Sequence, residues 1–180
     1  MPKVSQGHSS AYNNNGFSGG VAKSDYACNG ADGWSWSETL STYEDGINYA
    51  YTGTQNGMFF PKSCVTVGEI RDGTTNTYFC GEKYLIPDKY EASGTTGTAQ
   101  GDDWNCWMGP ESNDLARYSS YQPMQDRPGY DTGFQFGSAH AGSFGMAMCD
   151  GSAQRISCSI DAETHLNLGK KADGKVANLP

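Results

Sequence analysis

Residues 136–160 carry the clearest local fold signal in the chain: Phe-Gly-Ser-Ala-His-Ala-Gly-Ser-Phe-Gly-Met-Ala-Met-Cys-Asp-Gly-Ser-Ala-Gln-Arg-Ile-Ser-Cys-Ser-Ile. An Asp-Gly pair between two runs of alternating apolar residues is the strongest short-range signal for a β-hairpin. Its type I′ turn needs positive φ at both central residues, which glycine adopts without strain. The stretch therefore predicts strands near 143–149 and 152–159, with Asp150 and Gly151 as the two central residues of a tight turn.

A two-residue turn also determines which residues lie opposite each other. It places Met148 opposite Ala153 and Phe144 opposite Ser157. No polar side chain occurs from Phe144 to Cys149, so both faces of this strand are apolar. Because a strand with one solvated face alternates apolar and polar residues, this pattern places the strand inside the sheet or beneath another layer.

The composition extends the prediction to the whole chain of 180 residues, of which 24 are glycine. Many turn-forming residues and little helical periodicity predict an α+β fold that is mostly β, an antiparallel sheet with hairpins and long loops. A short C-terminal helix is expected from its N-cap Asp161 to Leu168, with Gly169 ending it. Residues 1–24 predict a flexible arm or loop, and 25–180 a single globular domain.

Three segments match a known pattern in the same order. Nine residues separate His140 from Asp150-Gly151, and the other two segments are Ser24-Asp-Tyr-Ala27 and Asp72-Gly-Thr-Thr-Asn-Thr77 followed by Gly81-Glu-Lys83. The chain resembles prepilin-type proteins with an H-x9-D-G domain, a planctomycete-type domain of undefined molecular role. The motif residues, for which we expect a structural role, are His140, Asp150, Gly151, Asp72, Gly73, Asn76, Gly81 and Glu82.

The resemblance implies a function outside the cytoplasm. It predicts the structural or interaction head domain of a pseudopilin-like exported protein, in a cell-surface or secretion-related assembly. The expected location is extracellular, at the cell surface or periplasmic, and the expected partners are proteins, either copies of itself or other pseudopilin-like subunits. The hydrophobic N-terminal helix of a prepilin is absent from this sequence, so we expect membrane contact only through that missing helix.

Charge and motifs narrow the function classes further. Twelve Lys and Arg against twenty Asp and Glu give a formal charge of -8, which disfavours nucleic acid as a partner because phosphate binding relies on concentrated Lys and Arg. A thiol nucleophile would pair Cys149 with His140, but no third orienting group is evident. An acid/base mechanism would use the Asp150 carboxylate, but the preference of Asp for tight turns already explains this residue. We therefore expect no catalytic residues and no enzyme.

The cysteines predict covalent cross-links. None of the six forms a Cys-x-x-Cys zinc pair, so disulfides are favoured over a metal, with the pairing left open. Cys149 with Cys158 is excluded because the predicted hairpin separates them along the strands. We expect at least one disulfide among Cys28, Cys64, Cys80, Cys106, Cys149 and Cys158.

Two metal hypotheses accompany the motif. Asp72, Thr74 and Asn76 place oxygens at alternate positions, as Ca²⁺ loops do, although the same residue types favour turns by bonding their own backbone. The turn is the preferred interpretation, and Ca²⁺ is the one cofactor considered. For His140 we prefer a hydrogen bond to backbone near the hairpin over a metal site shared with carboxylates from other loops.

Four tryptophans suggest an alternative function. Aromatic rings can stack on sugars, so a carbohydrate-binding module is the second hypothesis, whereas the simpler interpretation is that these rings cover the sheet. A glycan array read out by tryptophan quenching separates the two. The residues concerned are Trp34, Trp36, Trp104 and Trp107.

Overall fold

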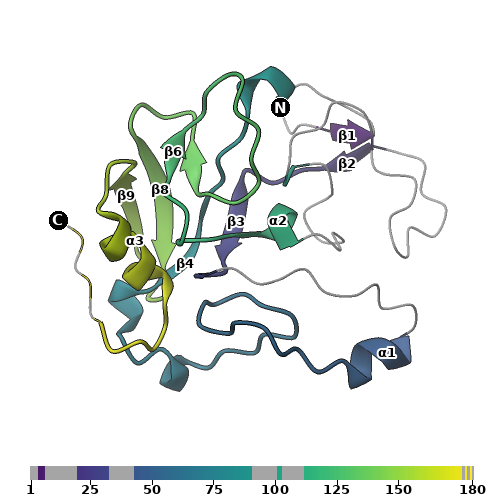
Figure 1. Cartoon of the computed structure of the whole chain (residues 1–180), viewed down its shortest axis with the longest axis vertical. Helices are drawn as coiled ribbons and strands as arrows, with labels where there is room; N and C mark the ends of the chain where they lie inside the picture. Colours follow the sequence, from purple (N-terminus) through teal and green to yellow (C-terminus); the bar gives the residue numbers. More distant parts are fainter. Residues whose placement is uncertain are drawn as a thin grey trace.

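A single main sheet organises the chain, in the strand order β5-β3-β4-β8-β9 (Figure 1). The computed structural model describes residues 4–6, 20–32, 43–90, 101–102, 112–175, 177 and 179. Neighbouring strands of the main sheet are antiparallel, except that β3 and β5 are parallel. The strands are β3 (Tyr26–Asn29), β4 (Tyr78–Glu82), β5 (Ala116–Arg117), β8 (Ser143–Met148) and β9 (Ala153–Ser157).

The remaining elements are short. β1 (Val4–Gln6) pairs antiparallel with β2 (Gly20–Ala22), and β6 (Met124–Gln125) pairs parallel with β7 (Gly137–Ser138). The predicted class, mostly β with an antiparallel sheet and a short C-terminal helix, is confirmed. The helices are α1 (Tyr43–Asn48), α2 (Ser112–Leu115) and α3 (Ala162–Gly169), with 3-10 turns η1 (Val67–Glu69), η2 (Thr74–Asn76) and η3 (Pro87–Lys89).

The N-terminal segment is described at its two strands and at residues 23 and 24. β1 and β2 both fall within residues 1–24, which the sequence predicts to be an arm or loop. The rest of that segment, apart from residues 23 and 24, lies outside the described residues. The predicted boundary at residue 25 therefore stays a prediction.

The hairpin forms where the sequence predicts it, but its register differs by one residue. β8 and β9 pair Ala147 with Ala153 and Phe144 with Ile156, whereas the prediction placed Met148 opposite Ala153. Because side chains alternate with a period of two, a slip of one residue exchanges the faces of one strand relative to the other. The predicted register is wrong, and the observed one places the apolar Ile156 beside Phe144.

The cause of the slip is the length of the turn. Three residues, Cys149-Asp-Gly151, form the loop. The amide of Gly151 donates to the carbonyl of Met148 (3.0 Å), and the amide of Met148 donates to the carbonyl of Ser152 (2.8 Å). Gly151 has φ +87°. This is the pattern of a turn followed by a left-handed residue, the usual three-residue hairpin, rather than the predicted two-residue turn.

The observed register gathers the large apolar side chains of the hairpin on one face of the sheet. α3 covers this face: Leu168 is fully buried, and the ring centre of His165 lies 6.0 Å from that of Phe144 (Figure 1). Burying each large apolar side chain contributes about 1.5–3 kcal/mol relative to exposure. The core comprises Tyr78, Phe136, Phe144, Met146, Met148, Ile156, Ile160 and Leu168.

A bulge in β4 keeps this core continuous. The register of β4 against β8 shifts between Tyr78 and Cys80. Phe79 is the extra residue at this bulge, and its side chain is 48% exposed, whereas Tyr78 is fully buried. Gly81 again faces the core, where a Cβ would come 2.5 Å from the end of the Met146 side chain. A larger residue would displace the end of that methionine and would come 3.1 Å from the carbonyl oxygen of Gly145.

The C-terminal helix matches its prediction closely. α3 spans Ala162–Gly169, and the carboxylate of its N-cap Asp161 accepts a hydrogen bond from the amide of Thr164 (2.9 Å). This contact satisfies one of the amides that a helix start leaves unpaired. Lys170 leaves the helix with extended backbone dihedrals.

The cysteine prediction is not met where it can be examined. Five cysteines have free thiols in this structure, and Cys106 lies outside the described residues. Within the described part of the chain, the helices are too short or too polar to cross a membrane. The described free cysteines are Cys28, Cys64, Cys80, Cys149 and Cys158.

Candidate functional site

The tip of the hairpin contacts the turn that precedes β4. The amide of Asp150 donates to the carbonyl of Thr74 (3.1 Å), and the amide of Cys149 donates to the carbonyl of Thr77 (2.9 Å). The Asp150 carboxylate accepts from the amide (2.9 Å) and hydroxyl (2.7 Å) of Ser152, and these hydrogen bonds lower the pKa of Asp150 below its usual value. The two Asp-Gly segments of the motif therefore lie against each other.

The turn at Asp72 is tied to the C-terminal part of the chain. The Asp72 carboxylate is nearly buried and accepts hydrogen bonds from the amides of Asp173 (2.7 Å) and Gly174 (3.0 Å). Gly73 has φ +98°, a conformation that favours glycine, and the Asn76 side chain donates to the Asp72 carbonyl (3.4 Å). These contacts are those of a structural turn.

The His140 loop, at the other end of the motif, is held against β4 by Glu82. Nε2 of His140 lies 3.5 Å from Oε1 of Glu82, and Oε2 of Glu82 accepts a hydrogen bond from the amide of Gly145 (2.6 Å). Glu82 is the last residue of β4, and Gly145 lies in β8. His140 itself is oriented through its amide, which donates to the Ser138 hydroxyl (3.0 Å). Glu82 thus links β4 to both the His140 loop and the hairpin.

His140 and Glu82 line an acidic cleft of about 270 Å³. Asp25, from the first motif segment, and Asp126 supply two further carboxylates, and Tyr90 is among the lining residues. Tyr90 donates its hydroxyl proton to Asp126, whose other oxygen accepts from the amide of Leu85 (3.0 Å). Burial raises the pKa of Asp126, and the nearby charges of Asp25 and Glu82 raise it further.

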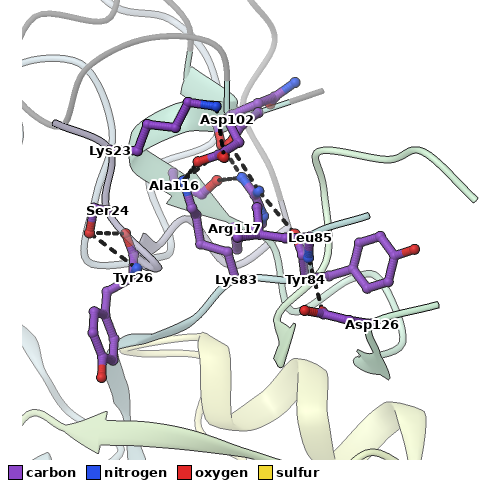
Figure 2. Close-up of polar contacts among 12 residues, drawn as sticks. Lys23, Ser24, Tyr26, Lys83, Tyr84, Leu85, Asp102, Ala116, Arg117 and Asp126 are labelled. Carbon is purple, nitrogen blue, oxygen red and sulfur yellow. Dashed lines mark hydrogen bonds and ion pairs between the residues drawn. The ribbon is translucent and has the colours of Figure 1, made fainter. Parts of the chain in front are cut away.

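Lys83, the residue after Glu82, also lines this cleft, and its ammonium belongs to a buried ionic network (Figure 2). Its ammonium donates to Asp102 (3.0 Å) and to the carbonyl of Gly101 (3.2 Å), and Lys23 reaches the other oxygen of Asp102 (3.2 Å). Burial lowers the pKa of Lys83, and Asp102 opposes that effect. The fully buried Arg117 also donates to the Gly101 carbonyl (3.2 Å). The network fixes residues 101–102 against the sheet.

Comparison with protein families gives a match over most of the chain. The family described as "Protein of unknown function (DUF1559)" has a model that matches residues 5–163. The chain belongs to this family. No curated protein and no solved structure matches the chain.

The DUF1559 match covers every motif segment whose contacts are described above. The structure joins these segments pairwise: the hairpin tip to the Asp72 turn, and the His140 loop to Glu82. His140 and Cys149, the residues of the rejected nucleophile hypothesis, lie beyond opposite ends of β8. Burial raises the pKa of Cys149 to about 11.

The metal and carbohydrate hypotheses stay predictions. In the part of the chain that the structure describes, no three His, Cys, Asp or Glu side chains are grouped to hold a metal ion. Both oxygens of Asp72 accept hydrogen bonds from distant backbone amides, those of Asp173 and Gly174. Ca²⁺ at Asp72, Thr74 and Asn76 is nevertheless not tested. The carbohydrate hypothesis rests on residues outside the described ranges, namely Trp34, Trp36, Trp104 and Trp107.

The sequence alone did not indicate two features of this DUF1559 chain. Asp126 carries no local motif signal, and it reaches Leu85 across 41 positions of sequence. Lys83 lies in a motif segment, whereas its partner Asp102 follows a Gly/Thr-rich stretch of the kind that predicts an exposed loop. In the structure, Asp102 is 5% exposed. The one indication in the sequence that Asp102 is buried is general: a buried charge such as that of Lys83 requires a partner of opposite sign.

Proposed function

We propose that this chain is the structural or interaction head domain of a pseudopilin-like exported protein, acting in a cell-surface or secretion-related assembly. Two findings support the proposal. The chain belongs to the DUF1559 family over residues 5–163, and its sequence resembles prepilin-type proteins with an H-x9-D-G domain. The expected location of the head is extracellular, at the cell surface or periplasmic.

The observation that carries the proposal is how the motif residues are used. Asp72, Glu82 and Asp150 all accept hydrogen bonds from backbone amides of other parts of the fold or of their own turn. A carboxylate that accepts a hydrogen bond from a backbone amide holds that part of the backbone in place, and its removal leaves the donor without this partner. The motif therefore supplies a rigid frame, and function is assigned to the surface that this frame presents.

That surface is the face of the sheet opposite α3, which we call the outer face. Tyr26 is 59% exposed and Phe79 48% exposed, although both belong to central strands. Tyr26 lies opposite Glu82 in the β3–β4 register, so this aromatic ring adjoins the acidic cleft. Exposed aromatic residues favour protein interfaces, and the carboxylates favour a partner that is basic at the facing position. The proposed occupant is another protein subunit with a basic contact surface.

Site-specific photo-crosslinking in the native host tests this proposal. A benzophenone amino acid replaces Tyr26 in the full-length gene product, and the matched control replaces Val67, which is 75% exposed in η1, outside the sheet. We expect protein adducts at position 26, in excess of those at position 67, and cleavage of the head by protease added to intact cells. A head that stays protected inside the cell, or equal adducts at both positions, would contradict the proposal.

A further inference from the structure

β3 and β4 bring two thiols face to face. Cys28 and Cys80 are register partners in this antiparallel pair, and both are half-buried and unbridged. Residues directly opposite in an antiparallel pair point to the same face, with Cβ atoms typically about 4.5–5.5 Å apart. The two sulfur atoms therefore lie close together on one face of the sheet, although 52 positions separate the two residues in sequence.

The hydrogen bonds identify which kind of pair this is. The amide of Lys83 donates to the carbonyl of Asp25 (2.9 Å), so these two residues form a hydrogen-bonded pair. Such pairs alternate with non-hydrogen-bonded pairs along the strands, and Cys28 and Cys80 lie three positions further along. They form a non-hydrogen-bonded pair, in which Cα atoms approach to about 4.5 Å. That separation falls within the range that a disulfide bridges, about 4.4–6.8 Å.

We propose that Cys28 and Cys80 form a cross-strand disulfide when the folded chain meets a disulfide donor. A thiolate of the pair attacks the donor disulfide and releases one donor thiol. The second cysteine then attacks the mixed disulfide and releases the other. In total the pair loses two electrons and two protons, and the donor is reduced to two thiols. This inference needs only such a donor and does not depend on the proposed function.

Cys149 is the nearest competitor, and geometry disfavours it. Ala147 is the direct partner of Cys80 in β8, so Cys149 stands two residues further on. Diagonal neighbours of this kind are typically about 7–8 Å apart between Cα atoms, beyond the usual disulfide range. The thiol of Cys149 is instead directed at the carbonyl of Tyr78 (3.7 Å). Cys28 is therefore the predicted partner of Cys80.

Burial sets the pace of the reaction. It raises the pKa of Cys28 and of Cys80, and the Cys80 charge raises that of Cys28 further. Because the thiolate is the reacting form, the bond should close slowly at neutral pH and faster as pH rises.

Peptide mapping of the complete chain tests the bond. The chain is equilibrated with glutathione disulfide, alkylated and cut with trypsin, which leaves Cys28 alone in peptide 24–62, Cys80 alone in 72–83 and Cys149 alone in 118–155. We expect peptides 24–62 and 72–83 joined, with a mass two hydrogens below their sum. The same product is expected from Cys149→Ser, the matched control, but not from Cys80→Ser. A bridge from Cys80 to any other cysteine, or both thiols still free at equilibrium, would overturn the proposal.

Thermal melting provides a second readout. A bond that closes so long a segment should raise the melting temperature of the oxidised chain by roughly 5–15 °C over the reduced chain. Cys149→Ser should keep this redox difference and Cys28→Ser should lose it. Equal melting temperatures for the joined and reduced wild-type chain would show that the bond strains the sheet as much as it constrains the unfolded state.

Discussion

His165 is a histidine that the core holds uncharged. It is fully buried on α3, and its Nδ1 lies 3.2 Å from the Tyr78 hydroxyl, while Nε2 has no hydrogen-bond partner. The rings of Phe136 and Phe144 meet it edge-on. Burial lowers the pKa of His165 to about 4, because the charged imidazolium would have to give up water without a counter-ion.

This shift predicts a loss of stability in mild acid. The unfolded chain binds a proton at His165 near pH 6.5, whereas the folded chain does so only near pH 4. The free energy of unfolding should therefore fall as pH drops from 6.5 to 4, by up to about 3 kcal/mol from this residue. Urea unfolding across that range measures it. In His165→Leu this part of the slope should disappear, and an unchanged slope would show that His165 is not the group responsible.

The burial of individual charged residues is a feature that the sequence alone does not predict. Lys83 was assigned to a motif from its neighbours, but its partner Asp102, which also pairs with Lys23, is brought to it by the tertiary fold alone. Asp102 follows a Gly/Thr-rich stretch that predicts an exposed loop. No local pattern distinguishes a solvated acidic residue from one that neutralises two buried lysines, because the difference lies in burial.

At the scale of elements, local signals were sufficient where the contacts are local. α3 was predicted from its cap, and the observed hydrogen bond from Thr164 to Asp161 joins residues three apart. The hairpin position was also predicted. Its register was not, because Asp-Gly serves both a two-residue and a three-residue loop, and the packing of Ile156 beside Phe144 favours the longer one. Because of this one-residue difference, every predicted cross-strand pair differs from the observed pair.

Gly151 tests the loop conformation. Its φ is +87°, and nothing lies within 4 Å of the position of a Cβ, so the cost of substitution comes from the backbone rather than from a clash. Gly151→Val should lower the free energy of unfolding by about 1–3 kcal/mol, since β-branched residues tolerate positive φ poorly. Gly151→Asn is the matched control and should lose less, because asparagine enters the left-handed region more readily. Equal stability of the valine variant and wild type in thermal melts would refute this loop conformation.

At the scale of the whole molecule, β4 is the element on which the motif converges. The turn before it receives the hairpin tip at Thr74 and Thr77, and Glu82 at its end receives His140 and Gly145. The H-x9-D-G spacing therefore matches the span of β8 and its loop, which runs antiparallel to β4. In this account the motif fixes a frame, and the outer face of the sheet is left for contact with a partner.

Native-state hydrogen exchange tests that central claim most directly. Three amides of the hairpin, those of Gly145, Cys149 and Asp150, donate to Glu82, Thr77 and Thr74. If the motif is part of the structural frame, these amides open only when the whole domain unfolds, and their opening free energy equals that from urea unfolding. The amide of Ser159, in an exposed turn, should exchange far faster. Exchange of the three hairpin amides through local opening, several kcal/mol below global unfolding, would contradict the account.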